Sequence, residues 1–302
     1  MVNPKIRGIL LALATGVLWA VSSPSTKLLG LAGVDMSTVV VCRTLGTSAL
    51  LGALLYFTAP EELNVTRREL FRLFFISLIV PVGLYLGFML SVVYLSISTA
   101  LVVHYTAPTV TALCSRLITG ESPSRSDYIG AGLVVLGVGC SVMRPDWTID
   151  TAISIPGLLC GAVAVVGLSG LTLLGRASVT KGGVSGLGTF VYSNFFGIFW
   201  SSLYKTFTIG WSDVPGLSLY EWQLIATPTV LTCVVGYLLY YRALKYITAP
   251  MANLLASTEI LVAVLMTSLA IKSMPTAPQM LGCALIFGAI VLESLGSHKK
   301  AA

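Results

Sequence analysis

Ionisable side chains within long apolar stretches are the first candidates for chemistry in this sequence. Glu259 lies about 14 residues into one stretch and His104 about eight residues from the end of another, roughly 21 and 12 Å deep at helical rise. Charged groups are costly inside a membrane and suggest a function there. A buried carboxylate can bind an amine or carry a proton, and an imidazole can donate, accept, stack or titrate. We predict that Glu259 and His104 contact a substrate or carry a proton. The alternative for Glu259 is a structural carboxylate that pairs with Arg43 or caps helix backbone. The alternative for His104 is a hydrogen bond to a neighbouring Ser or Thr at a helix interface.

Two basic residues also fall inside apolar stretches, and we predict them to be structural charges. Arg43 would form a buried pair or clamp backbone carbonyls. Lys27 lies near the end of the first stretch, where its long side chain can reach the membrane surface. The alternative for Lys27 is attraction of substrate carboxylates at the mouth of a transport path.

Polar aromatic and amide side chains supply further candidates for substrate binding. Trp19 lies mid-stretch, away from the interfacial belt where Trp usually collects, so its indole N–H needs a partner. Phenol rings can stack on a flat substrate or surround a quaternary amine, and an amide can hydrogen-bond either a substrate or a helix. Packing is the competing interpretation for each residue. The candidates of this kind are Trp19, Tyr85, Tyr237 and Asn253.

Four prolines lie within apolar stretches, where each removes a backbone donor and favours a kink. We predict that these kinks shape a cavity or act as hinges for gating. The four are Pro24, Pro81, Pro108 and Pro228.

The composition identifies the elements that must position these residues. The chain has 302 residues, 56% apolar and 10% charged, whereas soluble domains carry about 25% charge. Ten helices of about 21 residues would leave roughly nine residues per connection. This excludes a large soluble enzymatic, nucleotide-binding or receptor domain.

Six cysteines lie in apolar stretches without a C-x-x-C pair, so we expect no disulfide framework, no metal site and no cofactor.

Ten apolar runs predict an all-α integral membrane protein with ten transmembrane helices. With the N-terminus inside, thirteen of the 18 Lys and Arg residues fall in inner segments, three fall outside and two lie within spans. Basic residues concentrate on the cytoplasmic side, so both termini are predicted to be cytoplasmic. The runs cover 8–30, 36–58, 71–91, 94–118, 127–143, 153–175, 186–208, 221–241, 246–271 and 277–296.

Weak internal matches at offsets of 147 to 152 residues indicate a repeat. Pro81 matches Pro228, Tyr94 matches Tyr241, and Gly130 matches Gly282. The first copy would span 1–148 and the second 149–302. Because five spans are an odd number, the second copy must be inverted, as in secondary transporters whose substrate site lies at the repeat interface. We predict two inverted five-helix repeats around a central cavity.

Several motifs then resemble the drug/metabolite transporter superfamily, in its ten-helix EamA-type branch. The resemblance covers the whole chain, although Ile260 stands where the family often has proline after Glu259. It implies a basket-like transporter whose cavity is lined by spans one, three and four and by spans six, eight and nine. His104 is similar to a histidine of amino-acid exporters. The motifs are Trp19 among small residues ending at Lys27, Arg43, Ala107-Pro108, Gly120-Glu121, Tyr128-Ile-Gly130 and Ser257-Thr-Glu259.

The predicted function is a secondary transporter that exports small metabolites, most favourably amino acids including aromatic ones, by alternating access. The alternative is a carrier of cationic drugs or quaternary amines, with proton coupling through Glu259 or His104. We expect no enzyme, since the loops lack a catalytic cluster, and a channel fits less well. Expected partners are a small-molecule substrate and the lipid bilayer, not nucleic acid. We expect a monomer in the cytoplasmic (inner) membrane.

Overall fold

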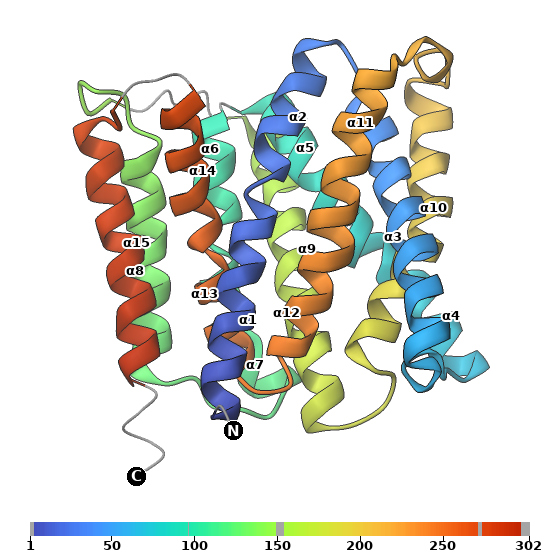
Figure 1. The fold of residues 1–302 in the computed structure, drawn as a ribbon, viewed down its shortest axis with the longest axis horizontal. Helices are drawn as coiled ribbons and strands as arrows, with labels where there is room; N and C mark the ends of the chain where they lie inside the picture. Colours follow the sequence, from blue (N-terminus) through green and yellow to red (C-terminus); the bar gives the residue numbers. More distant parts are fainter. Residues whose placement is uncertain (1–2, 96, 149–153, 271–273, 297–302) are drawn as a thin grey trace.

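The computed structural model describes residues 3–95, 97–148, 154–270 and 274–296, and every regular element in these ranges is helical. They form ten helical passes (Figure 1). Short 3-10 turns lie at Pro60–Leu63 and Val214–Gly216. The passes are α1 (Pro4–Trp19) with α2 (Ser22–Leu31); α3 (Met36–Thr58); α4 (Arg67–Ser77), η2 (Leu78–Gly83) and α5 (Leu84–Tyr94); α6 (Ile97–His104) with α7 (Ala107–Ile118); α8 (Arg125–Ser141); α9 (Ile155–Thr180); α10 (Gly186–Thr208); α11 (Leu219–Pro228), η4 (Thr229–Gly236) and α12 (Tyr237–Ala243); α13 (Ala249–Ala256) with α14 (Thr258–Ala270); and α15 (Ala277–Gly296).

Each predicted apolar run coincides with one of these passes, which confirms an all-α multi-pass membrane protein. Within the described ranges, seven passes are long and apolar enough by themselves to cross a membrane. The other three are exceptional in different ways. The pass of α6 and α7 consists of two short helices, α8 has only 17 residues, and α10 buries polar groups that include Asn194 and Lys205.

The two halves of the chain run in opposite directions through the bundle. We call the end at which α1 begins the proximal end, and the opposite end the distal end. In Figure 1, α15 ends at the proximal end, whereas α9, the first helix of the second half, begins at the distal end. The second set of five passes is therefore inverted relative to the first.

Helix packing between the halves is reciprocal. Helix α1 packs against η4, α12, α13 and α14, which belong to the eighth and ninth passes. Helix α9 packs in the same way against η2, α5, α6 and α7, from the third and fourth passes. The remaining equivalent helices pair directly, α3 with α10 and α8 with α15. The interface between the repeats therefore runs through the centre of the bundle.

Equivalent helices of the two halves begin with the same kind of capping residues. Thr66 and Glu69 form a capping box at α4, and Ser218 and Glu221 form the equivalent box at α11, 152 residues later. Capping residues satisfy backbone N–H groups that the first helical turn leaves unpaired. The repeated caps indicate that matching sequence signals set the start of equivalent helices in both halves.

The four predicted kink prolines lie at or near interruptions of the α-helices. Pro81 lies inside the π-helical segment η2, and Pro228 directly precedes the π-helical segment η4. Pro24 follows the break between α1 and α2 by a few residues, and Pro108 lies at the start of α7. A further interruption at Ser257 separates α13 from α14 without a proline. Such π segments are frequent at functional sites.

Glycine allows the close approach of α8 and α15, and this packing is testable. A Cβ atom at Gly282 would overlap the Ser141 hydroxyl and the Gly137 carbonyl and lie 2.6 Å from the Ser141 nitrogen. We expect Gly282→Ala to lower the free energy of unfolding by about 1–3 kcal/mol, because backbone atoms cannot yield cheaply. Gly288→Ala is the matched control, since a Cβ there meets nothing within 4 Å. Thermal unfolding in detergent measures both, and equal stability of the two variants would contradict this packing.

Candidate functional site

An aromatic cluster lies at the interface between the repeats, at the end of α1. The Trp19 ring lies 5.0 Å from Tyr237 and 5.1 Å from Tyr240, and Phe190 stacks on Tyr237 at 4.3 Å. Gly236 leaves room for the indole, because a Cβ there would lie 3.0 Å from Nε1 of Trp19. All four aromatic side chains are buried. The structure thus brings the predicted Trp19 and Tyr237 together from opposite repeats.

Glu259 lies beside this cluster, at the interruption between α13 and α14. Its carboxyl has the Tyr105 hydroxyl as its side-chain hydrogen-bonding partner, and its charge acts on Tyr237. Gly16 of α1 fits against the same interruption, since a Cβ there would lie 2.6 Å from the Ala256 carbonyl oxygen and 2.9 Å from the Glu259 nitrogen. Helix α1 of the first repeat therefore packs directly against the backbone that positions Glu259 of the second repeat.

Arg43 lies near Tyr85 and Cys233 and is 6% exposed. Its guanidinium donates a 3.2 Å hydrogen bond to Thr26 Oγ1, and its charge acts on the Tyr85 hydroxyl and the Cys233 thiol. In the described part of the chain, no carboxylate forms an ion pair with Arg43. The considered pairing of Arg43 with Glu259 is therefore wrong, since Tyr105 partners the carboxyl instead.

The remaining candidates lie around this centre. The His104 ring lies 4.7 Å from Phe88 and 5.5 Å from Tyr105, and its buried Nδ1 has no hydrogen-bond partner among the described residues. The Asn253 amide donates a 2.9 Å hydrogen bond to Thr111 Oγ1, which joins α13 to α7. The side chain of Lys27 lies outside the described part of the structure.

A cavity of about 300 Å³ lies toward the proximal end, between α3, α10 and α12. Its lining includes Leu54, Thr58, Glu62, Arg242 and Lys245. None of the predicted substrate-binding residues contributes to this lining. The central residues are instead packed against one another in this conformation.

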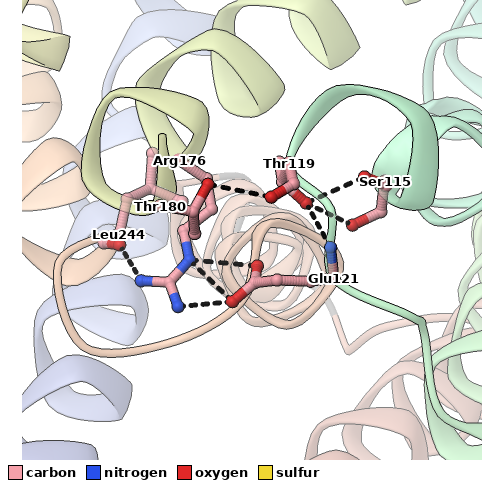
Figure 2. A network of polar contacts seen from close by, with 6 residues as sticks. All are labelled: Ser115, Thr119, Glu121, Arg176, Thr180 and Leu244. Atoms are coloured by element: carbon pink, nitrogen blue, oxygen red, sulfur yellow. Dashed lines mark hydrogen bonds and ion pairs between the residues drawn. The ribbon is translucent and has the colours of Figure 1, made fainter. Parts of the chain in front are cut away.

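An ion pair bridges the two repeats at the proximal end (Figure 2). The Arg176 guanidinium near the end of α9 donates to both oxygens of Glu121, with contacts of 2.5–3.1 Å. It also donates a 2.6 Å hydrogen bond to the Leu244 carbonyl, beyond α12. Thr180 donates at 2.9 Å to the Thr119 carbonyl alongside. We call Glu121, Arg176 and Leu244 the proximal bridge.

A second inter-repeat ion pair lies at the same end, where Lys245 contacts Glu62 at 2.8 Å. Burial tends to raise the pKa of Glu62, but the Lys245 hydrogen bond and the charges of Lys245 and Arg242 outweigh it and hold the pKa below 4.5. A lowered folded-state pKa means that the stabilisation is present above the unfolded pKa and is lost as pH falls through the folded value. This link therefore persists at neutral pH and is lost only when the pH falls through the lowered pKa of Glu62.

Fewer polar links between repeats involve the distal end of the described structure. The Thr38 hydroxyl donates to the Asp213 carboxylate, which also receives Lys205 Nζ at 2.9 Å. Lys205 and Asp213 both belong to the second repeat, so this ion pair does not bridge the halves. Lys205 is fully buried at the end of α10.

A comparison of the sequence with models of known protein families identifies the family of this chain. The model of the EamA-like transporter family matches residues 6–143 and again residues 155–295. The chain belongs to the EamA-like transporter family. It is accordingly a membrane transporter of small molecules, and the family's members are generally not enzymes.

A solved crystal structure of another protein shows that this EamA-like fold recurs. The two share 16% sequence identity, with a TM-score of 0.80 over 98% of this chain and 99% of that chain. At this identity the likeness concerns the fold alone. The comparison with curated proteins finds no match.

The proximal bridge is the functional arrangement that the sequence did not reveal. The resemblance to EamA-type transporters included Gly120-Glu121, yet it assigned no role to the carboxylate. Gly120 has φ +80°, a left-handed conformation that favours glycine after a helix. It turns the chain directly after α7, where Glu121 meets Arg176. Gly120 could have indicated a turn at this position from the sequence, but nothing in the sequence indicates that Arg176, 55 residues after Glu121, is the partner of the carboxylate.

Proposed function

We propose that this EamA-like protein is a secondary transporter that exports small organic metabolites, most favourably amino acids including aromatic ones, by alternating access. The observation that carries this proposal is the convergence of Glu259, Tyr237 and Trp19 at the repeat interface. A carboxylate suits a substrate ammonium group, and neighbouring aromatic rings suit a flat apolar side chain. Substrate sites of inverted-repeat transporters lie at this interface.

The proximal bridge supports alternation between two states. Its members come from both repeats, so it must break before the halves can separate at that end. Ion pairs partly exposed to water are individually weak, which allows such a link to open without a large barrier. In this proposal, the conformation with the intact proximal bridge is the one in which this part of the proximal end is closed.

We further propose that the proximal end faces the cytoplasm of a cell with the protein in its inner membrane. The bias of Lys and Arg toward this end supports the orientation. The proposed repeat units span 1–148 and 149–302, and the proposed functional unit is a monomer.

A carrier of cationic drugs or quaternary amines is the second candidate. Aromatic faces bind quaternary ammonium groups, and Tyr105, Trp19 and Tyr237 lie around or near Glu259. His104 and Glu259 would then serve a proton-coupled exchange, since imidazole and carboxyl groups can both take up and release a proton.

Counterflow in liposomes separates these functions. Purified protein is loaded with unlabelled amino acid, and uptake of labelled amino acids and of a labelled quaternary amine is followed with and without a pH gradient. We expect saturable exchange of a narrow set of amino acids, weakened in His104→Ala, with Gly288→Ala as the matched neutral variant. Exchange of the quaternary amine alone would favour the second candidate, and exchange of neither would contradict both.

A further inference from the structure

Arg43 carries a buried positive charge that forms no ion pair with any described residue. Its side chain is 6% exposed, its Nε has no hydrogen-bond partner, and Thr26 is its one hydrogen-bond acceptor among the described side chains. A guanidinium stays protonated in proteins, so it cannot escape burial by losing its proton. A buried charge is normally paired, because leaving it alone costs several kcal/mol. An anion supplied by a ligand would remove this cost.

Two further hydroxyl groups near Arg43 lack a well-formed hydrogen bond among the described residues. Thr47 follows Arg43 by one helical turn on α3, so both lie on the same face of the helix. Its hydroxyl faces the Cys233 thiol, a weak hydrogen-bonding group, and the hydroxyl of Tyr85 on α5 faces the same thiol and the Tyr237 hydroxyl. Thr47 is fully buried and Tyr85 is 9% exposed, yet neither hydroxyl oxygen makes a hydrogen bond of full geometry with a described residue.

These unsatisfied groups share one chemistry. A guanidinium N–H and two hydroxyl groups all donate hydrogen bonds, and buried polar groups in proteins are otherwise nearly always satisfied. The ligand group that suits them is an anion with several acceptor atoms, and a carboxylate matches a guanidinium in shape. Glu259 does not fill this role, because no ion pair joins it to Arg43 among the described residues and its carboxyl is partnered by Tyr105.

We propose that Arg43, Tyr85 and Thr47 form a subsite for the carboxylate of the transported molecule. This assignment rests on the proposed transport function and adds to it the charge that the substrate must carry. Tyr237 lies near both Tyr85 of this subsite and Glu259, so the subsite and the carboxylate together complement a zwitterion. Arg43 thus binds the substrate instead of serving as a structural charge.

Matched ligands test the subsite by direct binding to the purified full-length protein. Phenylalanine is compared with phenethylamine, which lacks the carboxylate. Benzoate is compared with benzamide, which lacks the negative charge, and neither member of this second pair carries an ammonium group. Isothermal titration gives each affinity. We expect the carboxylate member of each pair to bind at least about 30-fold more tightly, since truncating one partner of a buried charge pair has effects of this size.

Arg43→Met should bring both affinity ratios close to one, and Arg43→Lys should keep part of the preference. Arg7→Met is the control, because it removes a cation that lies over Tyr246 at the proximal end. Without ligand, Arg43→Met should unfold at the same or a higher temperature than the parent, since it removes an unpaired charge. A purely structural arginine would instead lower that temperature.

Several results would overturn the subsite. They are the absence of carboxylate preference in the parent protein, a preference unchanged in Arg43→Met, and marked destabilisation of ligand-free Arg43→Met. Should Arg43→Met not fold, the double variant Tyr85→Phe, Thr47→Val replaces it, and an unchanged ratio there overturns the proposal. Counterflow distinguishes failure of the transport function from failure of the subsite. If amino acids are exchanged but binding shows no Arg43-dependent carboxylate preference, the transport function stands and the subsite does not. If benzoate binding depends on Arg43 but no exchange occurs, the subsite stands and the transport function does not.

Discussion

Transport of amino acids should fall at least about 30-fold in kcat/KM when Glu259 is replaced with glutamine. The variant keeps the size of the side chain and can still bond to the Tyr105 hydroxyl, but it loses the charge that faces a substrate ammonium group. Removing one member of a buried charge pair costs about 2–5 kcal/mol, and each 1.4 kcal/mol is a factor of ten. Initial rates of exchange in liposomes, measured at several substrate concentrations, check the effect.

The controls for Glu259→Gln distinguish a role in the site from a general role of buried carboxylates. Glu293→Gln removes another buried acid, which lies beside Asp127 and away from the central aromatic cluster, and should leave transport unchanged. Tyr105→Phe removes the hydroxyl partner but keeps the charge, so its effect should be smaller. Full transport by Glu259→Gln, or an equal loss in Glu293→Gln, would contradict the assignment.

Arg176→Met should open the proximal end of the transporter. The substitution removes the bonds to Glu121 and to the Leu244 carbonyl together, so the two repeats lose one of their two described ion pairs at this end and keep Lys245–Glu62. A loss of about 1.4 kcal/mol shifts the equilibrium between closed and open states tenfold. Cysteine placed at Ser115, which is fully buried behind the bridge, should then react with a soluble maleimide about tenfold faster.

Charge reversal provides the control for this second experiment. Glu121→Arg combined with Arg176→Glu restores an ion pair in the opposite sense, and labelling of the cysteine at position 115 should slow again. Native cysteines are replaced beforehand, because six free thiols would add background. If Arg176→Met leaves the labelling rate unchanged, the proximal bridge does not control access at this end.

Most of the fold could be predicted from the sequence, because membrane burial leaves a strong signal. Apolar runs of sufficient length, the bias of basic residues and the matched prolines Pro81 and Pro228 indicate ten passes in two inverted sets. The break at Ser257 could not be predicted in the same way. No proline marks it, and Gly16 from a distant helix packs against it.

The site was predictable in its members but not in their pairing. Trp19, Tyr237 and Glu259 stood out because polar groups are rare in apolar runs, and the structure brings them together. Arg43 and Glu259 look like natural partners in sequence, since opposite charges in a membrane usually pair. Helix packing decides otherwise by placing Tyr105 beside the carboxyl and Thr26 beside the guanidinium.

The reciprocal packing of α1 and α9 has a consequence for how the chain is made. Helix α1 enters the membrane first, yet its partner helices in the eighth and ninth passes begin some two hundred residues later. Contacts between such distant segments slow folding and leave surfaces exposed meanwhile. The interior face of α1, with Gly16 and Trp19, therefore lacks its native contacts until synthesis is almost complete, and meanwhile it contacts lipid or the insertion machinery. Neither half can reach its final structure alone, so assembly of the transporter is a single late event.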